Sequence, residues 1–142
     1  MALVLVVEDQ DENLDLMVYL LTAFGHETLV ARDGAEGVAV AAQARPDLVV
    51  MDLQMPVMDG YEAAARLKAD PGLAEIPLVA VTAYAMVGDQ ERILRRGFDG
   101  YLTKPIDPEV FVSELERHLT SRTPDRTPDR TSDRTQPPGQ EE

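Results

Sequence analysis

Residues 48–60 read LVVMDLQMPVMDG, and this stretch decides the fold. The apolar run Leu48–Met51 predicts a strand, and the carboxylate of Asp52 follows it directly. Asp59-Gly60 then indicates a turn and the start of a helix. Because an unpaired carboxylate is costly among apolar neighbours, Asp52 between Met51 and Leu53 is the first candidate for a functional residue.

The same order, an apolar run followed by a helical stripe, occurs five times along the chain. The predicted strands are Leu3–Val7, Thr28–Ala31, Leu48–Met51, Leu78–Val81 and Gly100–Leu102. The predicted helices are Asp11–Phe24, residues 35–42, Gly60–Ala69, Met86–Arg96 and Pro108–Leu119. Five alternations of strand and helix predict an α/β fold, a doubly wound parallel sheet with helices on both faces.

Composition divides the chain of 142 residues near Thr120. Residues 121–142 contain no apolar side chain and repeat Thr-Pro-Asp-Arg, so we expect a disordered tail, and one domain over residues 1–120. We expect the output to lie in another protein, since no sequence remains after Thr120 for an effector domain.

Charge and residue usage exclude several classes of function. The net charge of −13 argues against direct binding to nucleic acid or anionic lipid. The chain has no cysteine, which excludes disulfides and zinc–thiolate sites and is consistent with a cytoplasmic location. The run Leu3–Val7 is too short for a signal peptide or a membrane span. The sequence contains neither of the glycine-rich motifs that bind nucleotides, G-x-x-x-x-G-K-S/T and G-x-G-x-x-G.

Polar residues follow four of the five predicted strands. Glu8 and Asp9 follow the first, Asp52 the third, Thr82 the fourth, and Lys104 comes just after the fifth. The carboxyl ends of parallel strands meet at one edge of a sheet, where ligands bind in this class of fold. Two carboxylates that meet there repel each other, and hard oxygen ligands favour Mg²⁺ as the relieving cation. Such a site would accept a phosphoryl group on a carboxylate.

Each of these residues also has a structural interpretation. Asp9 and Thr82 could be helix N-caps, and Lys104 could be a solvated surface lysine. We expect His26 and His118 to be structural rather than catalytic.

The motifs together resemble the CheY-like receiver domains of two-component signalling. The resemblance rests on residues 6–9, 51–60, 79–83 and 104–105 and covers roughly residues 2–120. Within this family, the sequence of residues 82–89 is most similar to that of stand-alone cell-division regulators and of the receivers of hybrid kinases. The resemblance implies a flavodoxin-like fold with strand order 2-1-3-4-5.

The family pattern also implies roles for individual residues. Asp52 would take the phosphoryl group from a histidine kinase or phosphotransfer protein. Mg²⁺ would be held by Asp9, Asp52 and the backbone carbonyl of Gln54, and by Glu8 through water.

The remaining motif residues match positions that respond to phosphorylation. Lys104 and Thr82 would contact the phosphoryl group, and Thr82 with the aromatic Tyr101 would form the switch. The Lys104–Pro105 peptide bond would be cis.

The resemblance implies a phosphorylation-operated switch that is not itself an enzyme, with slow self-dephosphorylation. Its signal would reach an unidentified downstream protein, or a second copy of the chain in a homodimer, through the face of the fourth helix, fifth strand and fifth helix. We expect Arg92, Arg95, Tyr101 and Phe111 to lie at that contact. The alternatives are a Mg²⁺-dependent aspartyl phosphatase and a phosphorylation-independent scaffold. The phosphatase commonly needs an acid two positions after the nucleophile, where this chain has Gln54.

Overall fold

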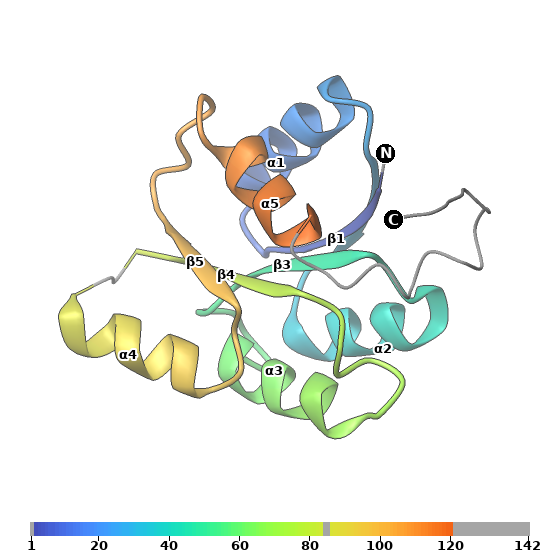
Figure 1. Cartoon of the computed structure of the whole chain (residues 1–142), viewed down its shortest axis with the longest axis vertical. Coiled ribbons are helices and arrows are strands. Elements are labelled where there is room, and N and C mark those ends of the chain that lie inside the picture. Colours follow the sequence, from blue (N-terminus) through green and yellow to red (C-terminus); the bar gives the residue numbers. More distant parts are fainter. Residues whose placement is uncertain (1, 84–85, 121–142) are drawn as a thin grey trace, which may run out of the picture.

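Five parallel strands form a single sheet with the order β2-β1-β3-β4-β5 in the computed structural model, which describes residues 2–83 and 86–120 (Figure 1). The strands are β1 (Leu3–Val7), β2 (Glu27–Ala31), β3 (Leu48–Asp52), β4 (Leu78–Thr82) and β5 (Gly100–Thr103). The helices are α1 (Asp11–Ala23), α2 (Gly34–Ala44), α3 (Gly60–Ala69), α4 (Val87–Arg95) and α5 (Phe111–Thr120). The predicted flavodoxin-like fold with its strand order is therefore confirmed.

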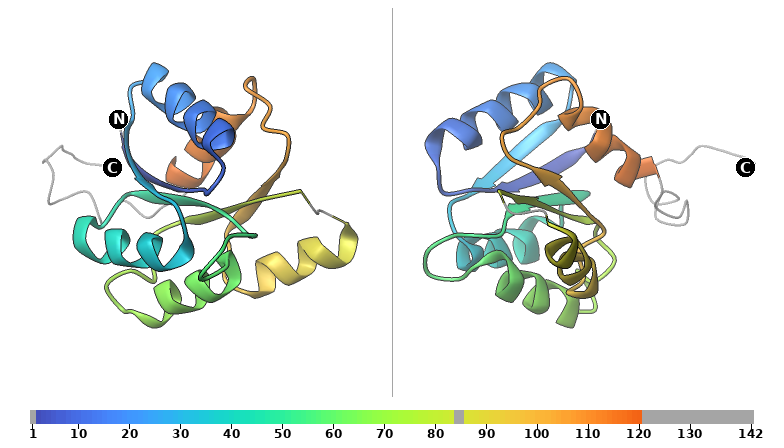
Figure 2. Two further views of the ribbon diagram at one scale, coloured as in Figure 1. Left: turned by 180° about the vertical axis from the view of Figure 1, so that it is seen from behind. Right: turned by 90° about the vertical axis from the view of Figure 1, so that its left-hand side faces the viewer.

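The helices cover both faces of the sheet, with α1 and α5 on one side and α2, α3 and α4 on the other (Figures 1 and 2). Apolar side chains alternate between the two faces along each central strand, so Val4 and Val6 join one core while Leu5 and Val7 join the other. Burial on both faces explains why these strands are continuous apolar runs in the sequence.

Strand pairing fixes where the site forms. β1 pairs with both β2 and β3, so the order of strands reverses between β1 and β3. Val7, at the end of β1, lies opposite Met51, and Asp52 comes next on β3. The residues that follow β1 and end β3 therefore meet at the reversal point, where open α/β sheets bind their ligands.

Several predicted boundaries need correction. The helix predicted from Pro108 begins at Phe111, because residues 108–110 form a turn in which the Asp107 carboxylate accepts from the Glu109 N–H at 3.0 Å. Asp9 is not the N-cap of α1, since Gln10 occupies that position, and Met86 rather than Thr82 precedes α4.

Two loop predictions are confirmed. Asp59 caps α3, its carboxylate accepting from the Glu62 N–H at 2.9 Å. Gly25 follows the end of α1 with a φ of 90°.

His26 has a structural role, as predicted. Its Nδ1 accepts from the Ala2 N–H at 3.1 Å and its Nε2 lies 2.7 Å from the Glu116 carboxylate.

The predicted disordered tail, residues 121–142, lies outside the described residues. Over the described ranges, none of the helices is both long enough and apolar enough to cross a membrane.

Candidate functional site

Three carboxylates converge at the carboxyl edge of the sheet. Glu8 and Asp9 come directly after β1, and Asp52 is the last residue of β3. One carboxylate oxygen from each lies within 4.8 Å of the other two. Glu8 is fully buried, Asp52 is 4% exposed and Asp9 is half-buried. The strand-exit residues predicted to meet do so.

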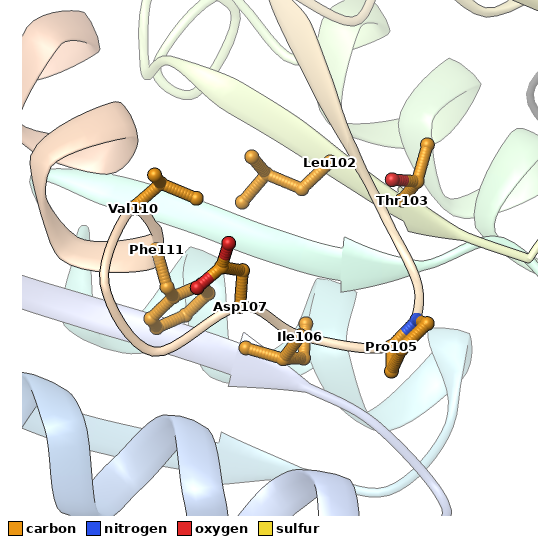
Figure 3. Close-up of a pocket in the computed structure, with 7 residues that line it drawn as sticks. All are labelled: Leu102, Thr103, Pro105, Ile106, Asp107, Val110 and Phe111. Atoms are coloured by element: carbon orange, nitrogen blue, oxygen red, sulfur yellow. The ribbon is translucent and has the colours of Figure 1, made fainter.

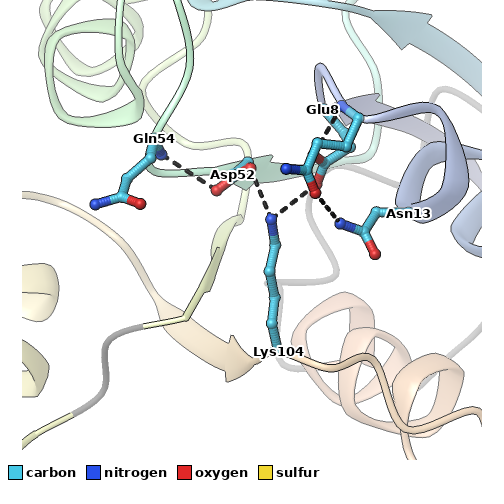
Figure 4. Close-up of polar contacts among 6 residues, drawn as sticks. Glu8, Asn13, Asp52, Gln54 and Lys104 are labelled. Atoms are coloured by element: carbon cyan, nitrogen blue, oxygen red, sulfur yellow. Dashed lines mark hydrogen bonds and ion pairs between the residues drawn. The ribbon is translucent and has the colours of Figure 1, made fainter.

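Lys104 supplies the positive charge of the site. Its Nζ donates to the Asp52 Oδ2 atom at 2.9 Å and lies 3.6 Å from the Glu8 Oε1 atom (Figure 4). Its backbone N–H donates to the Thr82 carbonyl at 2.8 Å, so the pairing of β4 with β5 positions the lysine. The Lys104–Pro105 bond is cis. Lys104 is thus a half-buried ion-pair partner and not a solvated surface lysine.

Backbone N–H groups orient the two buried carboxylates. The Gln54 N–H donates to Asp52 Oδ1 at 3.1 Å, and the Gln10 N–H donates to Glu8 Oε2 at 3.1 Å. The Asn13 side-chain amide in turn donates to the Gln10 side-chain oxygen at 2.8 Å. The role of the Gln54 carbonyl as a metal ligand stays a prediction.

The electrostatics of the site favour a cation. The pKa of Glu8 is raised from 4.5 to about 7, first by burial and then by the charge of Asp52. The Gln10 N–H and the Lys104 ammonium act in the opposite direction but do not cancel the effect. Burial alone would lower the pKa of Lys104, yet the hydrogen bond and charge of Asp52, with the charge of Glu8, raise it above 10.5.

A hard divalent cation fits this arrangement. Among the described residues, Glu8 Oε1 is a buried acceptor without a hydrogen-bond donor, 3.6 Å from Lys104 Nζ. Three carboxylates face one ammonium, so the cluster retains an excess of negative charge. Oxygen ligands without thiolate or imidazole are typical of Mg²⁺ sites.

Thr82 and Tyr101 face the same side of the sheet. Tyr101 pairs with Ala80, and Thr82 is two residues further along β4, so the pleat directs all three side chains to one face. Ala80 and Tyr101 belong to the core under α2, α3 and α4. Thr82 is 2% exposed. The two predicted switch residues therefore share the face that α4 covers.

A cavity of about 230 Å³ opens beside Thr82. It is lined by Leu53, Gln54, Tyr61, Thr82, Asp89 and Arg92. The Arg92 guanidinium lies 4.6 Å from the centre of the Tyr61 ring, and that of Arg96 lies 4.9 Å from it. The contact of Arg92 with Tyr61 has no local sequence signal, because the two residues belong to different helices, and the sequence indicates only an exposed docking role for Arg92.

A second cavity, of about 290 Å³, lies between β5 and α5 (Figure 3). Phe111 forms part of its wall and is only 1% exposed. Its ring packs in the core with Val112 and Leu115, so a partner contact near Phe111 would have to use the exposed residues beside it.

The family of the chain follows from comparison with known proteins. The family model for the response regulator receiver domain matches residues 4–116. The chain therefore belongs to the response regulator receiver domains, as the sequence motifs indicated. It is 42% identical over 116 residues to the polar-differentiation response regulator DivK of Brucella anthropi, covering 82% of this chain and 94% of that protein.

Solved structures agree with this assignment. The receiver domain of a sensor histidine kinase from Pseudomonas aeruginosa is 32% identical to this chain and superposes on it with a TM-score of 0.79. The match covers 84% of this chain and 98% of that one. That structure holds a magnesium ion in its active-site cleft. The chemotaxis protein CheY4 of Vibrio cholerae is 31% identical, with a TM-score of 0.78 over 82% of this chain and 98% of that one.

Proposed function

We propose that this receiver domain is a phosphorylation-operated switch that takes a phosphoryl group on Asp52 from a histidine kinase or phosphotransfer protein. The observation that carries the proposal is the environment of the Asp52 carboxylate. It is buried, bonded to Lys104 at 2.9 Å and grouped with two further acids. An oxygen of Asp52 would attack phosphorus while the bond from phosphorus to the donor imidazole breaks.

Mg²⁺ would be held by Asp9 and Asp52, by the backbone carbonyl of Gln54, and by Glu8 through water. When bound, it would neutralise carboxylate repulsion and balance the charge of the incoming phosphoryl group. Lys104 would stay paired with the modified side chain, because its ammonium already lies at Asp52 Oδ2. The Thr82 hydroxyl would donate a hydrogen bond to a phosphoryl oxygen.

We propose that the signal leaves through the face of α4, β5 and α5. Phosphorylation replaces the single negative charge of the Asp52 carboxylate with a phosphoryl group of charge close to −2, and gives Thr82 a new acceptor. Movement of Thr82 would let Tyr101, on the same face of the sheet, change position. Arg92 and Arg95 on α4 are exposed and would meet the downstream protein, or a second copy of the chain, in one of the two states.

A switch is favoured over an aspartyl phosphatase because Gln54 stands where that enzyme class needs an acid. The Gln54 amide cannot act as a general acid or base, so we expect only slow self-dephosphorylation. A phosphorylation-independent scaffold would have no need of the buried acid and lysine set, whose desolvation is costly.

The test is incubation with radiolabelled acetyl phosphate and Mg²⁺. We expect about one label per chain, stable in acid and lost in base, and no label in Asp52→Asn. Asp59→Asn is the matched control, since Asp59 lies in the same loop and Asn also caps helices well. Sustained turnover would favour the phosphatase, and an unlabelled parent chain would favour the scaffold.

A further inference from the structure

An uncharged apolar stretch, Met55-Pro56-Val57-Met58, follows the acceptor residue in the loop between β3 and α3. Met55 and Met58 are half-buried and pack against the core. Pro56 is exposed, and the side chain of Val57 is 84% exposed, the highest value among the large apolar residues of the described chain. This valine therefore contributes almost nothing to the core.

Val57 also sits at an unfavourable backbone position. Its φ is 69°, and the Met58 N–H donates to the Pro56 carbonyl at 2.7 Å, which makes a γ-turn centred on Val57. A β-branched residue is a clear outlier at positive φ, where glycine and asparagine fit without strain.

The backbone path of the loop has its own explanation. The Gly60 N–H donates to the Leu53 carbonyl at 2.9 Å, and the Gly34 N–H donates to the Met58 carbonyl at 3.0 Å. The first bond closes the loop, and the second ties it to the start of α2. They do not explain why valine occupies its centre, since a glycine or asparagine there would keep the bonds and relieve the strain.

Val57 lies in the loop that directly follows the buried acceptor, and this placement indicates what it contacts. Asp52 is 4% exposed, so a donor group reaches it only when the donor protein rests on the surrounding loops. The loop after β1 offers the charged and polar residues 8–10. The loop after β5 offers Asp107 beside Pro105. Among the large apolar residues of the described loops after the strands, Val57 is the most exposed, at 84%, ahead of Met86 at 76%.

We infer that Val57 is a docking contact for the protein that delivers the phosphoryl group, packing against apolar side chains beside the donor histidine. The inference rests on the proposed function, because it assumes a histidine donor. A strained, exposed apolar residue next to the reacting centre is consistent with selection for binding at the expense of stability.

The experiment compares Val57→Asn and Val57→Leu with the parent chain. Asparagine tolerates a positive φ better than a β-branched residue and removes the apolar surface, whereas leucine keeps that surface. The protein donor is the phosphorylated histidine-kinase core that labels the parent fastest among purified candidates, and the protein-free donor is acetyl phosphate. Thermal melting of each variant is measured in the same buffer.

We expect Val57→Asn to receive phosphoryl groups from the kinase core about 5- to 10-fold more slowly than the parent. Its labelling by acetyl phosphate should stay within about 2-fold of the parent, and its Tm should be about 4 °C higher because strain is relieved. Val57→Leu should retain the parent's rate with the kinase core.

Other outcomes overturn the inference in distinct ways. Unchanged transfer from the kinase core to Val57→Asn would exclude the contact. Equal slowing with both donors would mean that Val57 shapes the Asp52 loop instead of binding the donor. A parent chain that neither donor labels would refute the proposed function itself, and this inference with it.

Discussion

Replacing Glu8 by glutamine should remove a penalty that the metal-free chain carries at neutral and alkaline pH. Glu8 is fully buried beside Asp52, and its Oε1 atom has no hydrogen-bond donor among the described residues. Glutamine has nearly the same shape and no charge. The substitution therefore changes the electrostatics of the site while preserving its packing.

The magnitude follows from the pKa of Glu8. In the folded chain this carboxyl titrates at about 7, and in the unfolded chain at 4.5. Between these values the folded state holds a proton that the unfolded state has lost, so the free energy of unfolding falls as the pH rises. The difference, 7 − 4.5, at about 1.4 kcal/mol per pKa unit amounts to about 3 kcal/mol.

Urea denaturation in EDTA at several pH values between 5 and 8 measures the effect. We expect Glu8→Gln and the parent to be similar near pH 5 and the variant to be more stable by up to about 3 kcal/mol at pH 8. Lys104 does not interfere, because its raised pKa lies above 10.5 and its stabilising effect is lost only at higher pH. Glu12→Gln, an exposed site on α1, is the matched control and should show no such trend.

A difference between Glu8→Gln and the parent that stays constant across this pH range would refute the reasoning. Mg²⁺ provides an independent check. The cation prefers the ionised carboxylate, so its stabilisation of the parent should increase as the pH rises through 7. If Mg²⁺ stabilised the parent equally at pH 5 and pH 8, Glu8 would not be coupled to the metal.

Asp9→Ala should lose the rise in Tm that Mg²⁺ causes, measured by thermal melts with and without the cation, and should also lose the labelling of Asp52. If the variant still bound Mg²⁺ as well as the parent does, Asp9 would not be a ligand. Thr82→Ala should still be labelled, because the nucleophile and metal ligands remain, but should lose much of the phosphorylation-dependent gain in partner affinity; equal gains in a binding assay would exclude Thr82 as the coupling residue. Deletion of residues 121–142 should change the free energy of unfolding by less than about 0.5 kcal/mol, since these residues carry no apolar side chain; a loss above about 1 kcal/mol by urea titration would mean that they pack on the domain.

The sheet and the acid cluster could be predicted because their signals are local. Apolar runs such as Leu3–Val7 mark strands buried on both faces, and the polar residue after each run marks the edge where ligands bind. Parallel topology then brings Glu8 and Asp52 together although they are far apart in the chain. The family pattern added individual roles that spacing alone left open.

The features that escaped prediction depend on contacts between distant segments or on backbone angles. The γ-turn at Val57 has no composition signal, because valine is a residue that such turns disfavour. The start of α5 at Phe111 depends on the turn in which the Asp107 carboxylate accepts from the Glu109 N–H, a local bond that the apolar periodicity of the helix does not report. The pairing of Arg92 and Arg96 with Tyr61 depends on how α3 and α4 pack.

Strand pairing itself joins the two residues that would respond to a phosphoryl group. The Lys104 N–H is bonded to the Thr82 carbonyl, so a displacement of either residue acts on the end of β5 as well as on β4. β5 is an edge strand with one neighbour, and among the α4 side chains that the structure describes Ile93 alone is buried. Few packing contacts oppose a shift of these two elements, whereas α1 buries Leu14, Met17, Leu20 and Leu21. A charge change at Asp52 should therefore be expressed on the side of the domain that carries α4 and Tyr101, and α1 should remain in place.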